Sequence, residues 1–195
     1  MNPLLKLSGL IDRLTELIGK GTIWLVLVVT LVSAFNAMMR YTINYSSNAW
    51  LEVQWQLFSV IFLLMAGYAL LKNVHVRIDL VFGHLSPRTQ SIIDIIGTLF
   101  FLAPMVIMTI WLSIPLIQNS ISIDEQSANA GGLPLWPIKI MLPVGLGLLL
   151  LQALSELIKR IGFLAGKAPD PNKREHGSAA AEELADALKA AKGEE

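Results

Sequence analysis

The sequence contains no cysteine among its 195 residues. This absence excludes disulfide frameworks, thiol catalysis, Cys-ligated zinc and iron–sulfur clusters. Histidine is nearly as scarce, and His75, His84 and His176 are too scattered along the chain to indicate a metal cluster. We therefore expect neither a metal site nor a cofactor.

Charge is also scarce and carries no excess of one sign. Lys and Arg number 15, as do Asp and Glu, so the net charge is +0 and gives no reason to expect a nucleic-acid partner. Charged residues make up 15% of the chain, whereas water-soluble domains typically carry about 25%. The mean hydropathy of +0.58 agrees with this low content. These values indicate an integral membrane protein.

Four apolar runs are long enough to cross a bilayer. A helix needs about 20 apolar residues to cross a hydrocarbon core of roughly 30 Å, because lipid offers no partner to an unpaired backbone group. The runs are approximately 21–39, 53–71, 95–117 and 135–157. The sequence therefore predicts an all-α integral membrane fold, with four transmembrane helices in a domain of residues 21–158.

The basic residues near these spans are unevenly distributed between the two sides. Most of them flank the spans on the side of the two termini, whereas the opposite loops hold only Arg40 and Lys139. By the positive-inside rule, both termini are predicted to be cytoplasmic, and loops 40–52 and 118–134 to face outward.

The two flanks of this domain have patterns of their own. Residues 1–20 carry apolar side chains at helical spacing opposite Lys6, Arg13, Glu16 and Lys20. We expect an amphipathic helix in the cytoplasmic membrane interface, in contact with membrane lipids, although a helix packed on a partner protein would show the same pattern. Residues 159–195 are predicted to be a cytoplasmic tail that is partly disordered.

The predicted spans contain no chemical machinery. None carries an ionisable residue near its middle, where a proton relay, an ion path or a substrate counter-ion would need one. No histidine lies inside a span, and no Ser/His/Asp set, phosphate loop or HExxH motif occurs. We expect no catalytic, cofactor-binding or substrate-binding residues, and hence no enzyme. Four glycines instead offer small surfaces for close helix packing, namely Gly67, Gly97, Gly145 and Gly147.

Two polar clusters lie at the predicted span ends. In the outer hairpin, Asn36 and Arg40 end the first span, and Trp50 and Glu52 begin the second. We expect Arg40 and Glu52 to meet at one depth and form a partly buried ion pair, which either caps the hairpin or docks an external partner. The adjacent carboxylates Asp124 and Glu125 lie in the other outer loop, as solvated groups or as a contact for a periplasmic protein.

The predicted cytoplasmic loop contains the second cluster, His75, Arg77 and Asp79, which alternate with apolar residues. Its basic residues either only follow the positive-inside rule, which places them in a cytoplasmic loop, or they fix the loop against a partner or the N-terminal helix.

Several of these residues occur in an order that is typical of one family. Asn36-x3-Arg40-Tyr41, Trp50-x-Glu52, Gly67 and His75-Val76-Arg77-Ile78-Asp79 together resemble the small membrane subunit (DctQ type) of tripartite ATP-independent periplasmic (TRAP) transporters. The segment Gly132-Leu133-Pro134-Leu135-Trp136 agrees with this resemblance, which covers about residues 5–165. Val53 departs from it, because a second Glu is common at that position.

The resemblance implies a division of labour in a bacterial inner membrane. A large transmembrane transport subunit would move an organic acid with a sodium gradient, and a periplasmic substrate-binding protein would deliver that substrate. The small subunit would support the large one and help to receive the binding protein. Two other hypotheses remain, a self-sufficient homo-oligomeric transporter or channel and a membrane enzyme or redox anchor. The missing mid-span charges argue against the first, and the missing Cys and intramembrane His against the second.

Overall fold

The structure, a computed structural model, describes residues 3–45, 47–73, 85–129 and 131–169. Within these ranges the chain is helical, and its only β-type pairing is one isolated bridge between Gln126 and Pro134. The helices are α1 (Pro3–Ile43), α2 (Asn48–Lys72), α4 (Pro87–Gly97), α5 (Ala103–Ser122) and α6 (Trp136–Leu164), and a π-helical turn, η1 (Thr98–Leu102), joins α4 to α5.

Four helices are long and apolar enough to cross a membrane, counting α4, η1 and α5 as one. This confirms the all-α fold with four predicted spans. Helices α1 and α2, and the helix formed by α4, η1 and α5, extend past the apolar runs at both ends, and polar residues cap α2 and α4. Ser47 and Ser86 accept backbone N–H groups at the starts of α2 and α4, and Asn73 ends α2 in the left-handed conformation at a φ of 57°.

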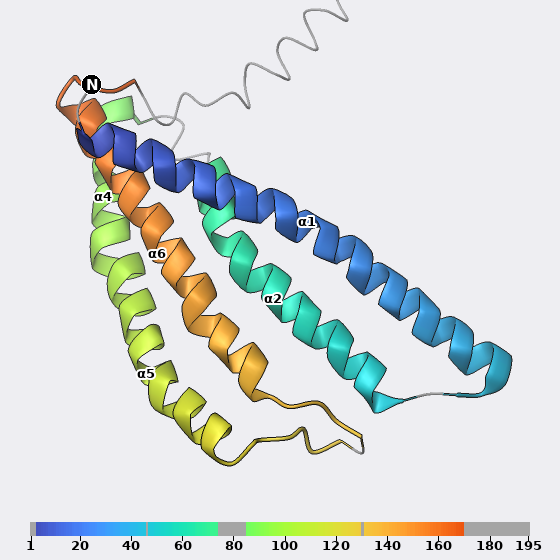
Figure 1. The fold of residues 1–195 in the computed structure, drawn as a ribbon. Coiled ribbons are helices and arrows are strands. Elements are labelled where there is room, and N and C mark those ends of the chain that lie inside the picture. The colour runs from blue at the N-terminus through green and yellow to red at the C-terminus, as the bar shows by residue number, and fades with distance from the viewer. Residues whose placement is uncertain (1–2, 46, 74–84, 130, 170–195) are drawn as a thin grey trace, which may run out of the picture.

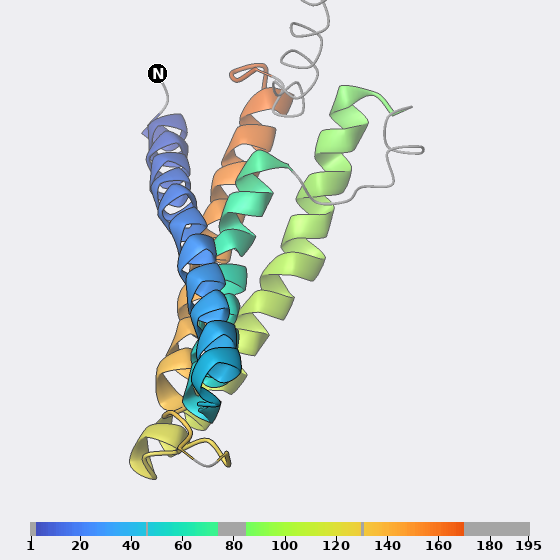
Figure 2. The same ribbon diagram turned by 90° about the vertical axis from the view of Figure 1, so that its right-hand side faces the viewer.

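The helices α2 and α6 lie at the centre of the bundle, between α1 on one side and α4–α5 on the other (Figure 2). Two of the four predicted packing glycines lie at the α2–α6 contact. A Cβ on Gly145 would be 2.7 Å from Cβ of Leu63, and a Cβ on Gly67 would be 3.4 Å from the carbonyl oxygen of Leu148. For the other two, Gly97 and Gly147, an added Cβ would have no such neighbour within 4 Å among the described residues.

The first helix is continuous across the boundary predicted at residue 20. At 1.5 Å per residue, its 41 residues span about 60 Å, roughly twice the thickness of a hydrocarbon core. Figure 1 shows α1 running obliquely, first across the end of α6 and then past α2. The pair Gly19 and Gly21 does not end the helix, because Gly19 allows the Tyr68 ring of α2 to pack directly against α1.

The interior of the bundle is more polar than its surface. Most of the buried side chains are polar or charged, and the helix faces that point outward are apolar. This distribution suits a protein whose solvent is lipid, because apolar side chains need no burial there and polar ones do.

Candidate functional site

One end of the bundle, the end that the sequence predicts to face outward, is organised around the carboxylate of Glu52, near the start of α2. The side chain is 2% exposed. It accepts hydrogen bonds from Nδ2 of Asn129 at 2.9 Å, from the backbone N–H of Leu133 at 2.6 Å and from the hydroxyl of Ser127. All three donors belong to the connection between α5 and α6, so Glu52 holds that connection against the start of α2.

The predicted ion pair between Arg40 and Glu52 is wrong. Arg40 is exposed in the last turn of α1, and among the residues that the structure describes no ion pair joins it to Glu52. The reason is that depth alone does not determine which way a helical side chain points. Glu52 faces α5–α6, where hydroxyl, amide and backbone donors stabilise the buried carboxylate without a cation. Both of its oxygens are therefore engaged by donors of the α5–α6 connection.

The remaining predicted residues of the hairpin lie at the α1–α2 contact. The ring of Trp50 packs edge-on against that of Phe35, with centroids 5.5 Å apart and planes inclined by 61°. Asn36 is half-buried one residue after Phe35. Trp50 thus fastens α2 to α1, while Glu52, two residues later, fastens α2 to the α5–α6 connection.

The α5–α6 connection is also closed by its own contacts. The N–H of Ser127 donates to the carbonyl of Leu133 at 3.0 Å, and Nε2 of Gln56 in α2 donates to the carbonyl of Pro134 at 3.4 Å. The ammonium of Lys139 bonds to the carboxylate of Glu125, and this contact holds the pKa of that carboxyl below its usual range. The connection is therefore folded, and we define its residues 123–129 and 131–135 as the outer platform, named for the side on which the sequence predicts it.

A second polar cluster, which the sequence did not predict, lies at the opposite end of the bundle. Lys159 of α6 is 2.9 Å from Oδ2 of Asp12 in α1. The next residue, Arg160, is 3.0 Å from Oδ2 of Asp94 in α4 and 2.7 Å from Oε2 of Glu156. Only 2% of Arg160 is exposed. We name Asp12, Asp94, Glu156, Lys159 and Arg160 the inner ionic cluster, and it joins α1, α4 and α6.

Uncharged polar groups extend the inner ionic cluster toward the middle of the bundle. Asp12 also accepts from Nε2 of Gln152 at 2.9 Å and from the hydroxyl of Ser155 at 2.7 Å. The hydroxyls of Ser155 and Ser8 are 2.8 Å apart. The signal that could have revealed these contacts is the polar spacing itself, with Ser8 and Asp12 four residues apart on α1 and the polar residues of α6 recurring every three to four.

The loop residues His75, Arg77 and Asp79 lie outside the described residues, so their proposed contact with a partner or with the N-terminal helix stays a prediction.

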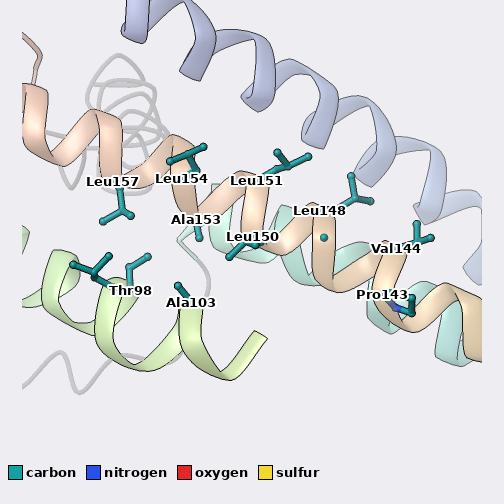
Figure 3. Close-up of a pocket in the computed structure, with 12 residues that line it drawn as sticks. Thr98, Ala103, Pro143, Val144, Leu148, Leu150, Leu151, Ala153, Leu154 and Leu157 are labelled. Atoms are coloured by element: carbon teal, nitrogen blue, oxygen red, sulfur yellow. The ribbon is translucent and has the colours of Figure 1, made fainter. Parts of the chain in front are cut away.

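An apolar groove of about 700 Å³ lies between α6 and the helix formed by α4, η1 and α5. Figure 3 shows Leu157 of α6 pointing toward Thr98 of η1. Thr98 is the one polar residue in a lining of leucines and small side chains, such as Ala103 and Gly147. Such a lining suits hydrocarbon rather than a carboxylate. Among the described residues, no three His, Cys, Asp or Glu side chains are grouped so as to hold a metal ion.

Comparison with known families gives one match. A family model described as "Tripartite ATP-independent periplasmic transporters, DctQ component" matches residues 10–162. The match covers most of the chain, including both polar clusters. No curated protein matches the chain.

Proposed function

Because the chain belongs to the family of DctQ components of TRAP transporters, we propose that it supports a large transmembrane transport subunit and helps to receive a periplasmic substrate-binding protein. The transported substrate would be an organic acid, taken up with sodium by the large subunit. Sodium coupling and substrate class derive from the resemblance of the motifs and not from any pocket in this chain.

The strongest argument for a scaffold role is the position of the buried charges. Within the described residues, the buried charges occur at the two ends of the bundle and join its own helices, as Arg160 joins Asp94 and Glu52 joins Leu133. The outward surfaces between these ends are apolar, with Phe62 and Trp111 among the most exposed side chains. Such helices can pack against lipid or another membrane subunit, and they provide no polar route along which a carboxylate could cross.

The proposed orientation follows from the charge distribution. With both termini in the cytoplasm of a bacterium, the inner ionic cluster would lie at the cytoplasmic surface of the inner membrane and the outer platform at the periplasmic surface. The outer platform would then face the binding protein. Its fixed shape favours this role, because a preformed surface loses little conformational entropy on docking.

Reconstitution tests the proposal. The chain is co-expressed with a candidate large TRAP transporter subunit, purified through a tag on this chain and placed in liposomes with a candidate binding protein outside. A panel of carboxylates is supplied with and without an inward sodium gradient. We expect co-purification of the large subunit, and sodium-dependent uptake that requires all three proteins.

The alternative is a self-sufficient homo-oligomeric transporter or channel. Liposomes that contain this chain alone separate the two functions, since they should show no flux if the chain is a supporting subunit. Flux through the chain alone, or uptake by the large subunit and the binding protein that does not need this chain, would overturn the proposal.

A further inference from the structure

The N-terminal half of α1, residues 3–20, packs with its polar face inward. Ser8 and Thr15 are buried on the side that faces α6 and α2, whereas Leu10 and Leu17 on the opposite side are 65% and 71% exposed. Leu7 and Leu14 are exposed beside them. We name Leu7, Leu10, Leu14 and Leu17 the leucine face. Among the residues that the structure describes, no other helix covers it, because α1 lies at the edge of the described bundle (Figure 2).

A row of basic residues runs along one border of the leucine face. Lys6, Arg13 and Lys20 are seven residues apart, which is close to two helical turns, so they align along the helix axis. All three are exposed. Lys20 is 3.2 Å from Glu16 yet keeps 66% of its side chain exposed, and neither Lys6 nor Arg13 forms an ion pair with any described residue. We call these three residues the basic row.

The end of the basic row lies at the depth expected for a membrane surface. Trp24 follows Lys20 by one turn and is 69% exposed, and tryptophan is enriched at the level of lipid headgroups. Lys72, the last residue of α2, lies 3.4 Å from Glu16. This contact places Glu16 of α1 beside the end of α2. Residues 3–15 therefore extend beyond the apolar span and need a polar environment on one side and an apolar one on the other.

We propose that the N-terminal half of α1 is a binding site for anionic phospholipids, in which the basic row binds the headgroup phosphates and the leucine face inserts among the acyl chains. Positive charges along one border of an exposed leucine face match the two layers of the lipid in chemistry and order. This inference deepens the proposed interfacial position of residues 1–20. It requires the membrane location but not the role in a transporter, so its failure would leave the supporting role untouched.

Lipid binding to the full-length protein in detergent provides the first test. Native mass spectrometry compares the wild type with the double variant K6Q/R13Q, titrated with phosphatidylglycerol or with phosphatidylcholine. Because a basic residue near an anionic surface changes binding about fivefold, we expect the preference for phosphatidylglycerol to fall by about 25-fold. The matched control R40Q/R88Q removes two exposed basic residues elsewhere and should keep the preference within about twofold.

An unchanged preference in K6Q/R13Q, or an equal fall in R40Q/R88Q, would overturn the proposal. Glycerol 3-phosphate added at the same concentration should not compete. Competition by this soluble anion would show a phosphate site without a lipid component, and would also contradict the inference.

The absence of cysteine from the natural sequence permits a second test with single spin labels at Leu10→Cys and Leu17→Cys. In bilayers that contain phosphatidylglycerol, we expect both labels to collide with oxygen more than with a water-soluble nickel complex. A label at exposed Arg88→Cys serves as the aqueous reference. More frequent collision with the nickel complex than with oxygen at Leu10 and Leu17 would place the leucine face in water. Shielding of both labels from both reagents once the large subunit is bound would place it against a protein partner. Either result would refute the lipid site.

Discussion

The backbone N–H of Leu133 donates to Oε2 of Glu52 at 2.6 Å, and this single bond joins residues 81 positions apart. Together with the bond from Nε2 of Gln56 to the carbonyl of Pro134, it connects α2 to the outer platform between the ends of α5 and α6. Since Glu52 also accepts from Ser127 and Asn129, one buried carboxylate organises the whole platform.

Replacing Glu52 by Gln should loosen the outer platform. The two carboxylate oxygens of Glu52 accept from three donors, whereas the amide of Gln has one accepting oxygen and one donating nitrogen. At least one buried N–H or O–H group therefore loses its acceptor. We expect amide hydrogen exchange over residues 127–133 to accelerate by roughly tenfold or more, while exchange in α6 stays near the wild-type rate. Mass spectrometry of the deuterated protein in detergent measures both.

The control for this change is Arg40→Gln. It removes an exposed charge from the same hairpin, and among the described residues Arg40 forms no ion pair with Glu52. Its exchange rates should match those of the wild type. Protection that survives in the Glu52 variant but is lost in the Arg40 variant would contradict the hydrogen-bond arrangement described above.

Replacing Arg160 by Met should destabilise the bundle strongly. The substitution leaves the carboxylates of Asp94 and Glu156 in a buried site without the cation that bonds to both. Removing one partner of a buried ion pair typically costs about 3–5 kcal/mol. Thermal unfolding followed by circular dichroism in detergent should show a clear fall in midpoint. Lys20→Gln breaks an exposed pair and should change the midpoint little. Similar midpoints for the two variants would count against a structural role of the inner ionic cluster.

Replacing Gly145 by Ala should disturb the contact between α2 and α6. The added Cβ would lie 2.7 Å from both Cβ and the carbonyl oxygen of Leu63, a distance that forces the two helices apart. We expect a loss of about 1–3 kcal/mol, as is typical of overpacking. The matched variant Gly147→Ala adds a methyl group where no atom lies within 4 Å, and should be neutral or slightly stabilising because alanine favours a helix. Equal losses would refute the assigned packing.

The contact between Glu125 and Lys139 predicts a dependence of stability on pH. The ammonium of Lys139 lowers the pKa of Glu125 in the folded chain. The unfolded chain then binds more protons between the two pKa values, so stability rises with pH in this window. The contribution is complete above the unfolded pKa of about 4.3 and is lost as the pH falls through the lower, folded value.

Unfolding midpoints recorded between pH 3 and pH 6 (a range chosen around the reference pKa) test this dependence. Glu125→Gln should remove part of the acid sensitivity seen in the wild type. Asp124→Asn is the neighbouring control, because asparagine also tolerates the left-handed backbone found there at a φ of 45°. An acid sensitivity that disappears with Asp124 and not with Glu125 would reverse the assignment.

The spans were predictable from the sequence because the length of an apolar run and the thickness of a bilayer are directly comparable. The continuity of α1 was not, since Gly19-Lys20-Gly21 looks like a break until the Tyr68 ring is seen to pack there. Tertiary packing, which the local sequence does not contain, keeps the helix unbroken. The π-helical turn at Thr98–Leu102 was not predictable from the sequence either, because no residue in this segment indicates it.

The two clusters were predictable to different extents. The sequence indicated that Glu52 needs a partner at the membrane surface, but the rotation of α2 about its axis, which selects Leu133 over Arg40, depends on packing across the bundle. For the inner ionic cluster, the sequence shows Glu156 and Lys159 only as charged residues near the end of the fourth apolar run. The contact of Lys159 with Asp12, 147 positions away, required the oblique path of α1.

The unbroken course of α1 has a mechanical consequence. The Phe35–Trp50 contact near one end and the Asp12–Lys159 pair near the other lie on one helix without a hinge between them. If α1 rotated as a rigid helix about the contact between Gly19 and Tyr68, its two ends would move in opposite directions. Events on one side of the membrane would thereby change the strain on the other, with no cargo passing between them.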